Sequence, residues 1–97
     1  MSIKSSSKGA DYSKFEYRNP EYIVASMKKR RLAALLREVR VAANLTQDQV
    51  ADRIGQTQSY VSKYENGEQR LDLIELEAVC KAVGISLMDF VRRYLEG

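Results

Sequence analysis

From residue 20 onward, apolar side chains recur at helical spacing, and no stretch alternates apolar and polar residues as a strand does. The first helix is expected to begin at Asn19-Pro20-Glu21, where a capping residue precedes a proline and an early acid. Nothing interrupts the pattern before Ala43, so one long helix and a short helix leading into a main one near Lys28 fit equally well. Asn44 suits the left-handed position that closes a helix.

The inner face of this first helix combines apolar residues with one arginine. The expected inner positions are Ala33, Leu36, Arg40 and Ala43, flanked by Leu32 and Val39. A lone guanidinium among apolar side chains is costly to bury. Arg40 therefore either extends to water or meets an acidic partner.

Four shorter helices are expected to follow, each with its own start signal. The start signals are the capping box Thr46-Gln47-Asp48-Gln49, then Thr57, Asp72 and Ser86, and the stop signals are Gly55, Asn66-Gly67 and Gly84. The inward residues are expected to be Val50, Ala51, Ile54, Val61, Tyr64, Leu73, Leu76, Val79, Cys80 and Val83, and the last helix carries the apolar residues Leu87, Phe90, Val91, Tyr94 and Leu95. The pattern predicts an all-α fold, a compact bundle of five helices.

The connection between the second and third of these helices is informative. Gly55-Gln56-Thr57 is too short for an antiparallel hairpin, so the helices must cross steeply, as in a helix-turn-helix. Ala51 is small where the helices approach each other, and Gly55 supplies a positive φ. The polar residues that stay outside on the second helix of the pair are Gln58, Ser59, Tyr60 and Lys63. A helix with such a polar outer surface is of a size that fits the DNA major groove.

Length and composition narrow the range of functions. The chain of 97 residues makes one domain, and 44% apolar with 30% charged residues is ordinary for a globular protein. The longest apolar run has five residues, so we expect no membrane span and no membrane partner. The lack of a secretory apolar segment makes the cytoplasm the default location.

Missing residue types exclude most enzyme chemistry. The chain has no histidine and one cysteine, Cys80, and its five glycines form no phosphate-binding loop. Histidine-based catalysis, His-containing zinc sites and Cys-rich metal clusters are thereby excluded. We expect no enzyme activity, no metal and no cofactor, and we interpret Cys80 as a core residue rather than a redox sensor.

Charge is distributed unevenly along the chain. Residues 1–19 carry four basic and two acidic side chains, residues 20–43 carry six and two, and residues 44–97 carry six and nine. We interpret residues 1–19 as a flexible basic arm, whose aromatic residues leave docking and disorder equally open. The positive first half indicates a polyanionic partner, unless it is only a solvated helix surface.

Residues 32–95 resemble the XRE family of helix-turn-helix domains, the type of lambdoid phage repressors and Cro proteins. The matching residues are Arg37 and Arg40, the segment LTQDQVADRIG from Leu45, the segment SYVSKYENG from Ser59, and VGI at Val83. The resemblance implies a five-helix lambda-repressor-like DNA-binding domain over residues 20–97, with the helix Gln58 to Glu65 reading bases. It also implies a buried ion pair between Arg40 and Glu65, which ties the first helix to the recognition helix.

The resemblance assigns candidate contacts to double-stranded DNA. The candidates for base contacts are Gln58, Ser59, Lys63 and Tyr60, and those for phosphate contacts are Gln47, Thr57, Asn66, Arg70, Lys28, Lys29, Arg30 and Arg31. Gln47 is also expected to brace Gln58. Ser59 departs from repressors that have two consecutive glutamines at this point, which makes the second base hard to assign. Residues 44–97 are net negative, so the basic run 28–31 and the arm would have to supply the positive field.

These features favour a transcriptional regulator, a repressor that binds a palindromic operator as a homodimer. The expected dimer interface is the last helix, with Phe90, Val91, Tyr94 and Leu95, and the first helix is the rival interface. Within the same fold, an antitoxin or a restriction-modification controller is the nearest alternative, with a partner protein as a further option. A protein-bridging coactivator module that does not read DNA is the alternative from another class; its binding would ignore DNA sequence.

Overall fold

The computed structural model describes residues 20–97, which form five helices and no strand. In chain order these are α2 (Pro20–Ala42), α3 (Gln47–Ile54), α4 (Gln58–Glu65), α5 (Leu73–Val83) and α6 (Leu87–Glu96). The all-α prediction is confirmed for this part of the chain. The predicted arm, residues 1–19, lies outside the described residues. Among the helices described, none combines the length and the apolar character that crossing a bilayer requires.

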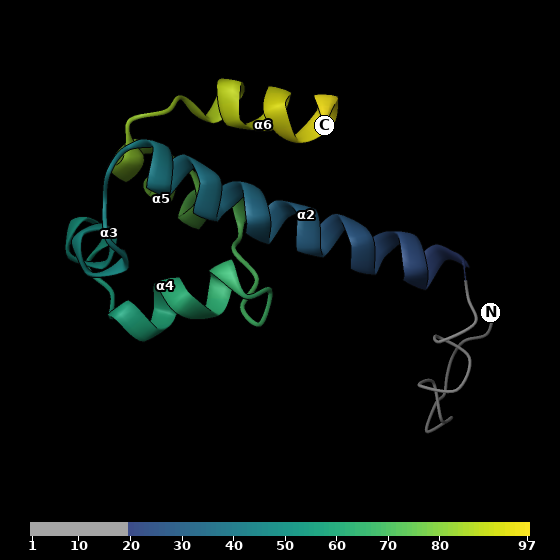
Figure 1. Cartoon of the computed structure of the whole chain (residues 1–97), viewed down its shortest axis with the longest axis horizontal. Helices are drawn as coiled ribbons and strands as arrows, with labels where there is room; N and C mark the ends of the chain where they lie inside the picture. The colour runs from purple at the N-terminus through teal and green to yellow at the C-terminus, as the bar shows by residue number, and fades with distance from the viewer. Residues whose placement is uncertain (1–19) are drawn as a thin grey trace.

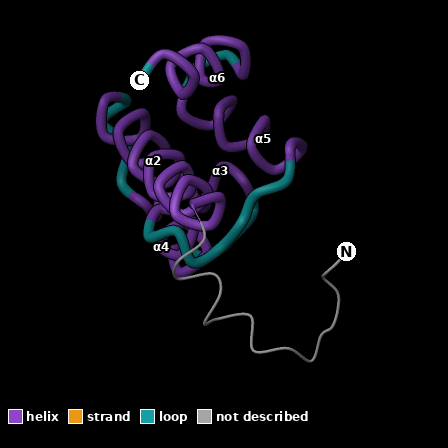
Figure 2. The backbone as a smooth tube through the Cα atoms, turned by 90° about the vertical axis from the view of Figure 1, so that its right-hand side faces the viewer, coloured by secondary structure: helices purple, strands orange, loops and turns teal. Residues whose placement is uncertain are grey.

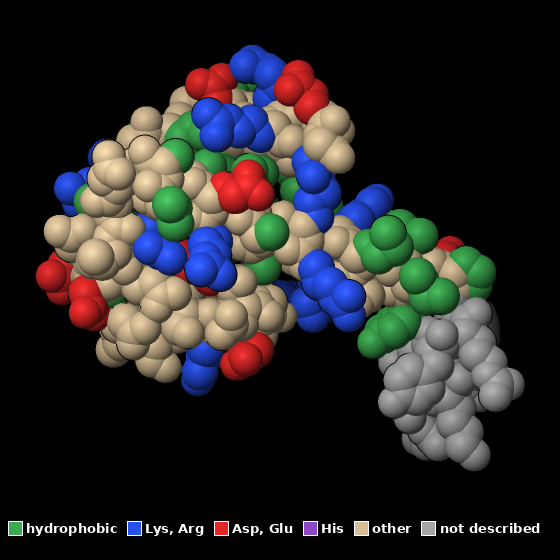
Figure 3. Space-filling model, viewed as in Figure 1, with side chains coloured by type: hydrophobic (Ala, Val, Ile, Leu, Met, Phe, Trp, Pro, Cys, Tyr) green, Lys and Arg blue, Asp and Glu red, His purple; other side chains and the backbone are tan. Residues whose placement is uncertain are grey.

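Helix α2 is a single continuous helix of 23 residues, which decides between the two arrangements that the sequence left open. It runs through the middle of the molecule, with α4 on one side of it and α6 on the other (Figures 1 and 2). Its first half projects beyond the other helices and carries an exposed group of apolar side chains (Figure 3). These exposed residues are Tyr22, Ile23, Val24 and Met27.

The helix boundaries follow the capping chemistry expected from the sequence. Thr46 and Asp72 each form a capping box, and Thr57 and Ser86 each accept a hydrogen bond from the backbone N–H three residues later. Asn44 has a φ of 60°, the one positive φ among the non-glycine residues described. These signals act locally, which is why the sequence alone placed them correctly.

The core lies where α2, α3, α4 and α5 meet, with α6 closing one side. Its buried residues are Leu35, Leu36, Val39, Val50, Ala51, Val61, Tyr64, Val79, Cys80, Ala82, Val83 and Phe90. Burial raises the pKa of the Cys80 thiol to about 11, as expected for a cysteine in the core. The inward prediction for Leu73 is wrong, because this residue is 66% exposed. Leu73 begins α5, and side chains lean toward the start of a helix, so it extends past the packed layer.

Helix α6 is held against α2 by Arg31. The Arg31 Nε donates to the carbonyl oxygen of Tyr94 at 3.0 Å, and its Nη2 donates to the carbonyls of Arg93 at 2.8 Å and Tyr94 at 2.7 Å. The guanidinium also lies 5.5 Å from the centre of the Tyr94 ring. The last carbonyls of a helix lack partners within it and favour a cation. Arg31 therefore fixes the end of α6.

Replacing Arg31 with alanine should lower the free energy of unfolding by about 1–2 kcal/mol, the range for charged hydrogen bonds discounted for partial exposure. Arg30→Ala is the matched control, since Arg30 is the exposed neighbour of Arg31 on the same helix. Urea unfolding followed by circular dichroism measures both variants. Equal effects of the two substitutions would contradict a structural role for Arg31.

Candidate nucleic-acid interface

The junction of α3 and α4 forms a helix-turn-helix. Gly55 has a φ of 68° and its N–H bonds to the carbonyls of the last turn of α3, which ends the helix and redirects the chain. Val50 and Val61 are fully buried on either side of the angle, and Ala51 is 2% exposed. With its inner face packed in this way, α4 presents the exposed side chains of Gln58, Ser59 and Lys63 outward.

Arg40 and Glu65 form a buried ion pair between α2 and α4, as the resemblance implied. Arg40 Nε donates to Glu65 Oε2 at 2.7 Å and Nη2 donates to Oε1 at 3.0 Å. A third donor, Nη1, bonds to the carbonyl of Leu45 at 2.8 Å. The Glu65 side chain is 2% exposed and that of Arg40 is 12% exposed. The hydrogen bond to Glu65 is the main reason that the pKa of Arg40 is raised.

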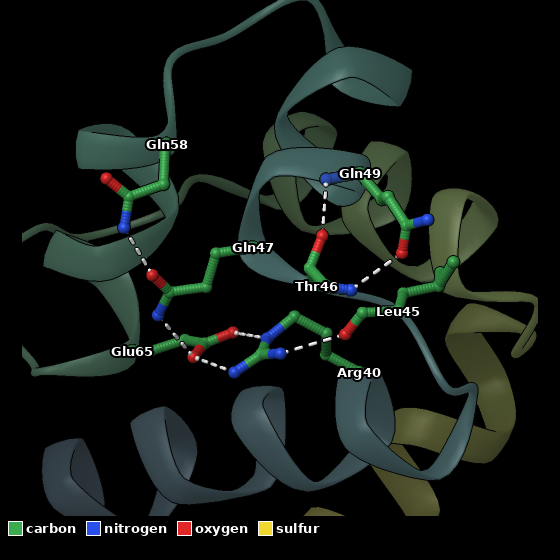
Figure 4. Close-up of polar contacts among 7 residues, drawn as sticks. All are labelled: Arg40, Leu45, Thr46, Gln47, Gln49, Gln58 and Glu65. Carbon is green, nitrogen blue, oxygen red and sulfur yellow. Dashed lines mark hydrogen bonds and ion pairs between the residues drawn. The ribbon is translucent and has the colours of Figure 1, made fainter.

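Two glutamines extend this pair to the surface. Gln47 Nε2, at the start of α3, donates to Glu65 Oε1 at 3.1 Å. Gln58 Nε2, at the start of α4, donates in turn to Gln47 Oε1. Figure 4 shows the four side chains as one connected series from the interior to the exposed end of α4. The prediction that Gln47 braces Gln58 is confirmed, and the link from Gln47 to Glu65 was not predicted.

Tyr60 is not placed to contact bases, contrary to the sequence prediction. Its ring lies edge-on to that of Tyr64, with 5.8 Å between the ring centres, and packs against the core. Burial, together with the neighbouring Glu75 carboxylate at the start of α5, raises the pKa of the Tyr60 hydroxyl. Residues four apart share a helix face, so Tyr60 had to follow Tyr64 inward. Its role is to pack α4 against α5.

Most candidate phosphate contacts are accessible. Lys28, Lys29, Arg30, Asn66 and Arg70 are exposed, and Gln47 is half-buried. The oxygen of Thr57 accepts the Tyr60 N–H at 3.2 Å, which leaves its hydroxyl proton available as a donor. Arg31 is the exception, and its prediction was wrong: its guanidinium is taken up by α6 on the side of α2 that faces away from α4 (Figure 1). The run of four basic residues does not reveal in the sequence that one of them, Arg31, binds the end of a helix more than sixty residues away.

A shallow hollow lies beside the two glutamines. It measures about 530 Å³ and is lined by Arg40, Val41, Asn44, Leu45, Thr46, Gln47, Asp48 and Gln58. The turn residues Asn44 and Thr46 at this hollow were not among the predicted site residues. Their proximity to Gln47 depends on how the end of α2 leads into α3, which only the assembled fold shows.

The predicted dimer surface on α6 needs revision. Phe90 is 1% exposed and belongs to the core, and Tyr94 is half-buried beneath Arg31, so these two predictions were wrong. Met88, Val91 and Leu95 are instead exposed by 75%, 37% and 74%. Their spacing of three and four residues places them on one face of α6. Met88 was not predicted because an amphipathic pattern shows which residues of a helix are apolar. It does not show which of those residues the core leaves exposed.

Comparison with known proteins identifies the family. The family model for helix-turn-helix domains matches residues 36–90. An XRE-family like protein from Pseudomonas syringae pv. tomato is 36% identical, with a TM-score of 0.75 over 80% of this chain and 95% of that one. The chain belongs to the XRE family of helix-turn-helix DNA-binding regulators.

Other solved structures share the fold. The clp gene regulator ClgR from Corynebacterium glutamicum is 26% identical, with a TM-score of 0.66 over 71% of this chain and 88% of that one. The restriction-modification controller protein C.Esp1396I, solved as a tetramer with its natural 35 base-pair operator, is 19% identical, with a TM-score of 0.66 over 71% and 91%. No curated protein matches the chain by sequence.

Removing one partner of the buried ion pair should destabilise this XRE domain strongly. Glu65→Ala strands the Arg40 charge in the interior, which should lower the free energy of unfolding by about 3–5 kcal/mol. Glu68→Ala removes an exposed glutamate three residues away and serves as the control. Thermal and urea unfolding measure both variants. A loss for Glu65→Ala no larger than that for Glu68→Ala would contradict the importance of the pair.

Proposed function

We propose that this protein is a non-catalytic, sequence-specific transcriptional regulator, a repressor that binds a palindromic operator as a homodimer. The observation that carries the proposal is the exposed polar face of α4, with Gln58, Ser59 and Lys63 on a helix that the Arg40–Glu65 pair anchors from behind. A helix with such a face fits the major groove, where each base pair presents its own pattern of donors and acceptors.

Gln58 is the proposed principal base reader. It begins α4, and the first turn of a recognition helix is the part that contacts base edges. Its carboxamide provides a donor and an acceptor, which match N7 and N6 of adenine. Ser59 and Lys63 are proposed to make the remaining base contacts, with Lys63 also within reach of a phosphate.

The proposed phosphate contacts surround this helix. Gln47 begins α3 and Thr57 caps the start of α4, where free N–H groups and the helix dipole favour an anion. Asn66 and Arg70 follow the end of α4. Lys28, Lys29 and Arg30 on α2 keep their exposed charges and are proposed to contribute the positive field that residues 44–97 lack.

The proposed dimer uses the exposed stripe of Met88, Val91 and Leu95 on α6. Because α6 and α4 lie on opposite sides of α2 (Figure 2), pairing through α6 leaves both recognition helices uncovered. A two-fold dimer then presents them about 34 Å apart, one turn of DNA, to an inverted repeat. The projecting apolar residues of α2, Ile23 and Met27 among them, form the rival surface.

Gln58→Ala tests the base contact. Affinity for an operator selected from random DNA should fall by about 1–3 kcal/mol, and the preference at one base pair per half-site should relax. Affinity for random DNA at the same salt should barely change, because no charge is lost. Fluorescence anisotropy with both DNAs measures the effect, and Gln56→Ala in the exposed turn is the control. Equal losses on both DNAs would place Gln58 on the backbone, and failure to select any sequence would favour a bridging module.

Leu95→Glu tests the dimer surface. A charge within the α6 stripe should weaken self-association by at least about tenfold, because burying an unpaired carboxylate is costly. Sedimentation equilibrium of the native protein and the variant measures this, with Met27→Glu on the rival surface as the matched substitution. A larger effect of Met27→Glu would move the interface to α2. A native protein that stays monomeric both free and on DNA would contradict the dimer.

A further inference from the structure

Residues 20–30 of α2 form what we call the α2 tip, which projects beyond the other helices (Figure 1). All of them are exposed except Ser26, which is half-buried. Ile23, Val24 and Met27 are exposed by 46%, 48% and 62%, and their spacing of three and four residues places them on one side of the helix. None of the three belongs to the core that the described residues form, so packing within the domain does not account for them. An apolar stripe on an exposed helix is typical of a contact surface.

Charge along the α2 tip changes sign from one end to the other. Glu21 lies at its start, and Lys28, Lys29 and Arg30 lie at its end. Two tips that paired in the same direction would bring their basic ends together, and these would repel each other. In an antiparallel pair, the acidic end of each tip faces the basic end of the other. The charges therefore favour antiparallel pairing of the tip with a second copy of itself.

The positions of the charges around the helix agree with this direction. Glu21 and Lys28 are seven residues apart, so both lie on the same side of the apolar stripe. The two-fold axis of an antiparallel pair brings each side of one helix against the same side of its partner. Glu21 of one tip then lies beside Lys28 of the other, and this contact is made twice. Exposed ion pairs add little affinity, but they select the direction of pairing.

The length of the tip suits the same arrangement. Residues 20–30 span about 16 Å at a rise of about 1.5 Å per residue. When two antiparallel tips overlap over this length, Ile23 of one lies level with Met27 of the other, and the two domains remain at opposite ends. Because the tip projects beyond α4 and α6, such pairing leaves the recognition helix and the α6 stripe uncovered (Figure 1).

The apolar stripe of the tip is too small to hold two free molecules together. A stable interface buries roughly 20–30 residues a side, and no second helix of residues 20–97 lies beside the tip to enlarge its stripe (Figure 1). The α6 stripe differs, because Ile74 on α5 is 77% exposed and lines, with Leu87, a groove of about 570 Å³ that extends the apolar surface. A weak contact becomes effective when DNA holds both partners, since their local concentration is then of roughly millimolar order.

We propose that the α2 tip joins neighbouring DNA-bound dimers of this protein by antiparallel pairing, so that one bound dimer assists the binding of the next. The proposal rests on the proposed function, in which a dimer formed through α6 binds an operator. It adds a second, weaker contact surface, whose partner is another copy of the same chain.

Met27→Glu tests the contact between dimers. The probe is DNA with two copies of the selected operator, prepared at spacings that cover one helical turn, about 10 base pairs. At the favourable spacing the native protein should bind the second operator about 5- to 150-fold more tightly than a single operator, the usual range of coupling between sites. Met27→Glu should lower this ratio to below about twofold, because pairing would bury an uncompensated carboxylate. The ratio removes any effect of the added charge on each operator separately.

Ala34→Glu is the matched control. Ala34 is exposed and lies seven residues after Met27, so this substitution adds the same charge to the same side of α2 but outside the tip. It should keep the native ratio. Gel-shift titrations measure the occupancy of one and two operators for all three proteins, and thermal unfolding verifies that the variants are folded.

Cysteine variants test the direction of pairing. Ile23→Cys and Met27→Cys, prepared as separate proteins, are bound to the two-operator DNA alone or as an equal mixture and are then oxidised. Antiparallel pairing predicts more disulfide in the mixture than in either protein alone, because Ile23 lies level with Met27 of the partner tip. Cys80 should stay unreactive, since it is buried and the pKa of its thiol is raised to about 11.

The outcomes separate this proposal from the proposed function. If the native protein binds single operators but shows no coupling at any spacing, or if Met27→Glu keeps the coupling, the role of the tip is overturned and the proposed function stands. Equal loss of coupling in Ala34→Glu overturns it too, because the effect would not depend on the tip. Disulfide yields in the mixture no higher than in the single proteins overturn the antiparallel pairing. A native protein that selects no operator overturns the proposed function and this proposal together.

Discussion

The buried pair of Arg40 and Glu65 is the constraint on which the arrangement of this domain depends. Eight-residue helices such as α3 and α4 are too short to be stable alone, so packing has to hold them. The pair joins α4 to the much longer α2, and the third donor of Arg40 binds the Leu45 carbonyl in the connection between α2 and α3. One guanidinium thus fixes both helices of the helix-turn-helix relative to α2. An apolar pair of the same volume would serve packing equally well, but it would leave Gln47 without an acceptor.

Some of the basic side chains in the described part of the chain stabilise the fold. Arg31 binds the carbonyls at the end of α6, and Arg53 donates to the Ala82 carbonyl near the end of α5 at 2.7 Å. Both satisfy helix ends that would otherwise lack partners. A count of basic residues therefore overestimates the number of cationic groups that are free to contact phosphates directly. The exposed side chains of Lys28, Lys29 and Arg30 matter the more for such contacts.

What the sequence could predict was the part governed by local rules. Caps, turn glycines and the inward faces of α3 and α4 depend on residues within one or two turns, and the steep crossing follows from a three-residue turn. Phe90, Tyr60 and Arg31 were misplaced because their surroundings come from distant parts of the chain. An apolar helix face is wider than the core it meets, so periodicity identifies the face without showing which of its residues remain exposed. The same limit applies to Arg31, whose partners lie 62 and 63 residues away.

The positions of Arg31 and Arg40 on α2 explain how the proposed DNA-reading and dimer surfaces are held in a fixed arrangement. Arg31 and Arg40 are nine residues apart, which at 3.6 residues per turn is two and a half turns, so they point to opposite sides of the helix. Arg40 meets α4 on one side and Arg31 meets the end of α6 on the other (Figure 1). One rigid helix thereby sets the distance between the recognition helix and the α6 stripe. In a dimer formed through that stripe, the separation of the two recognition helices would include this distance twice, once in each protomer. The spacing of the two half-sites on DNA would therefore depend on the rigidity of α2 more than on any contact at the DNA itself.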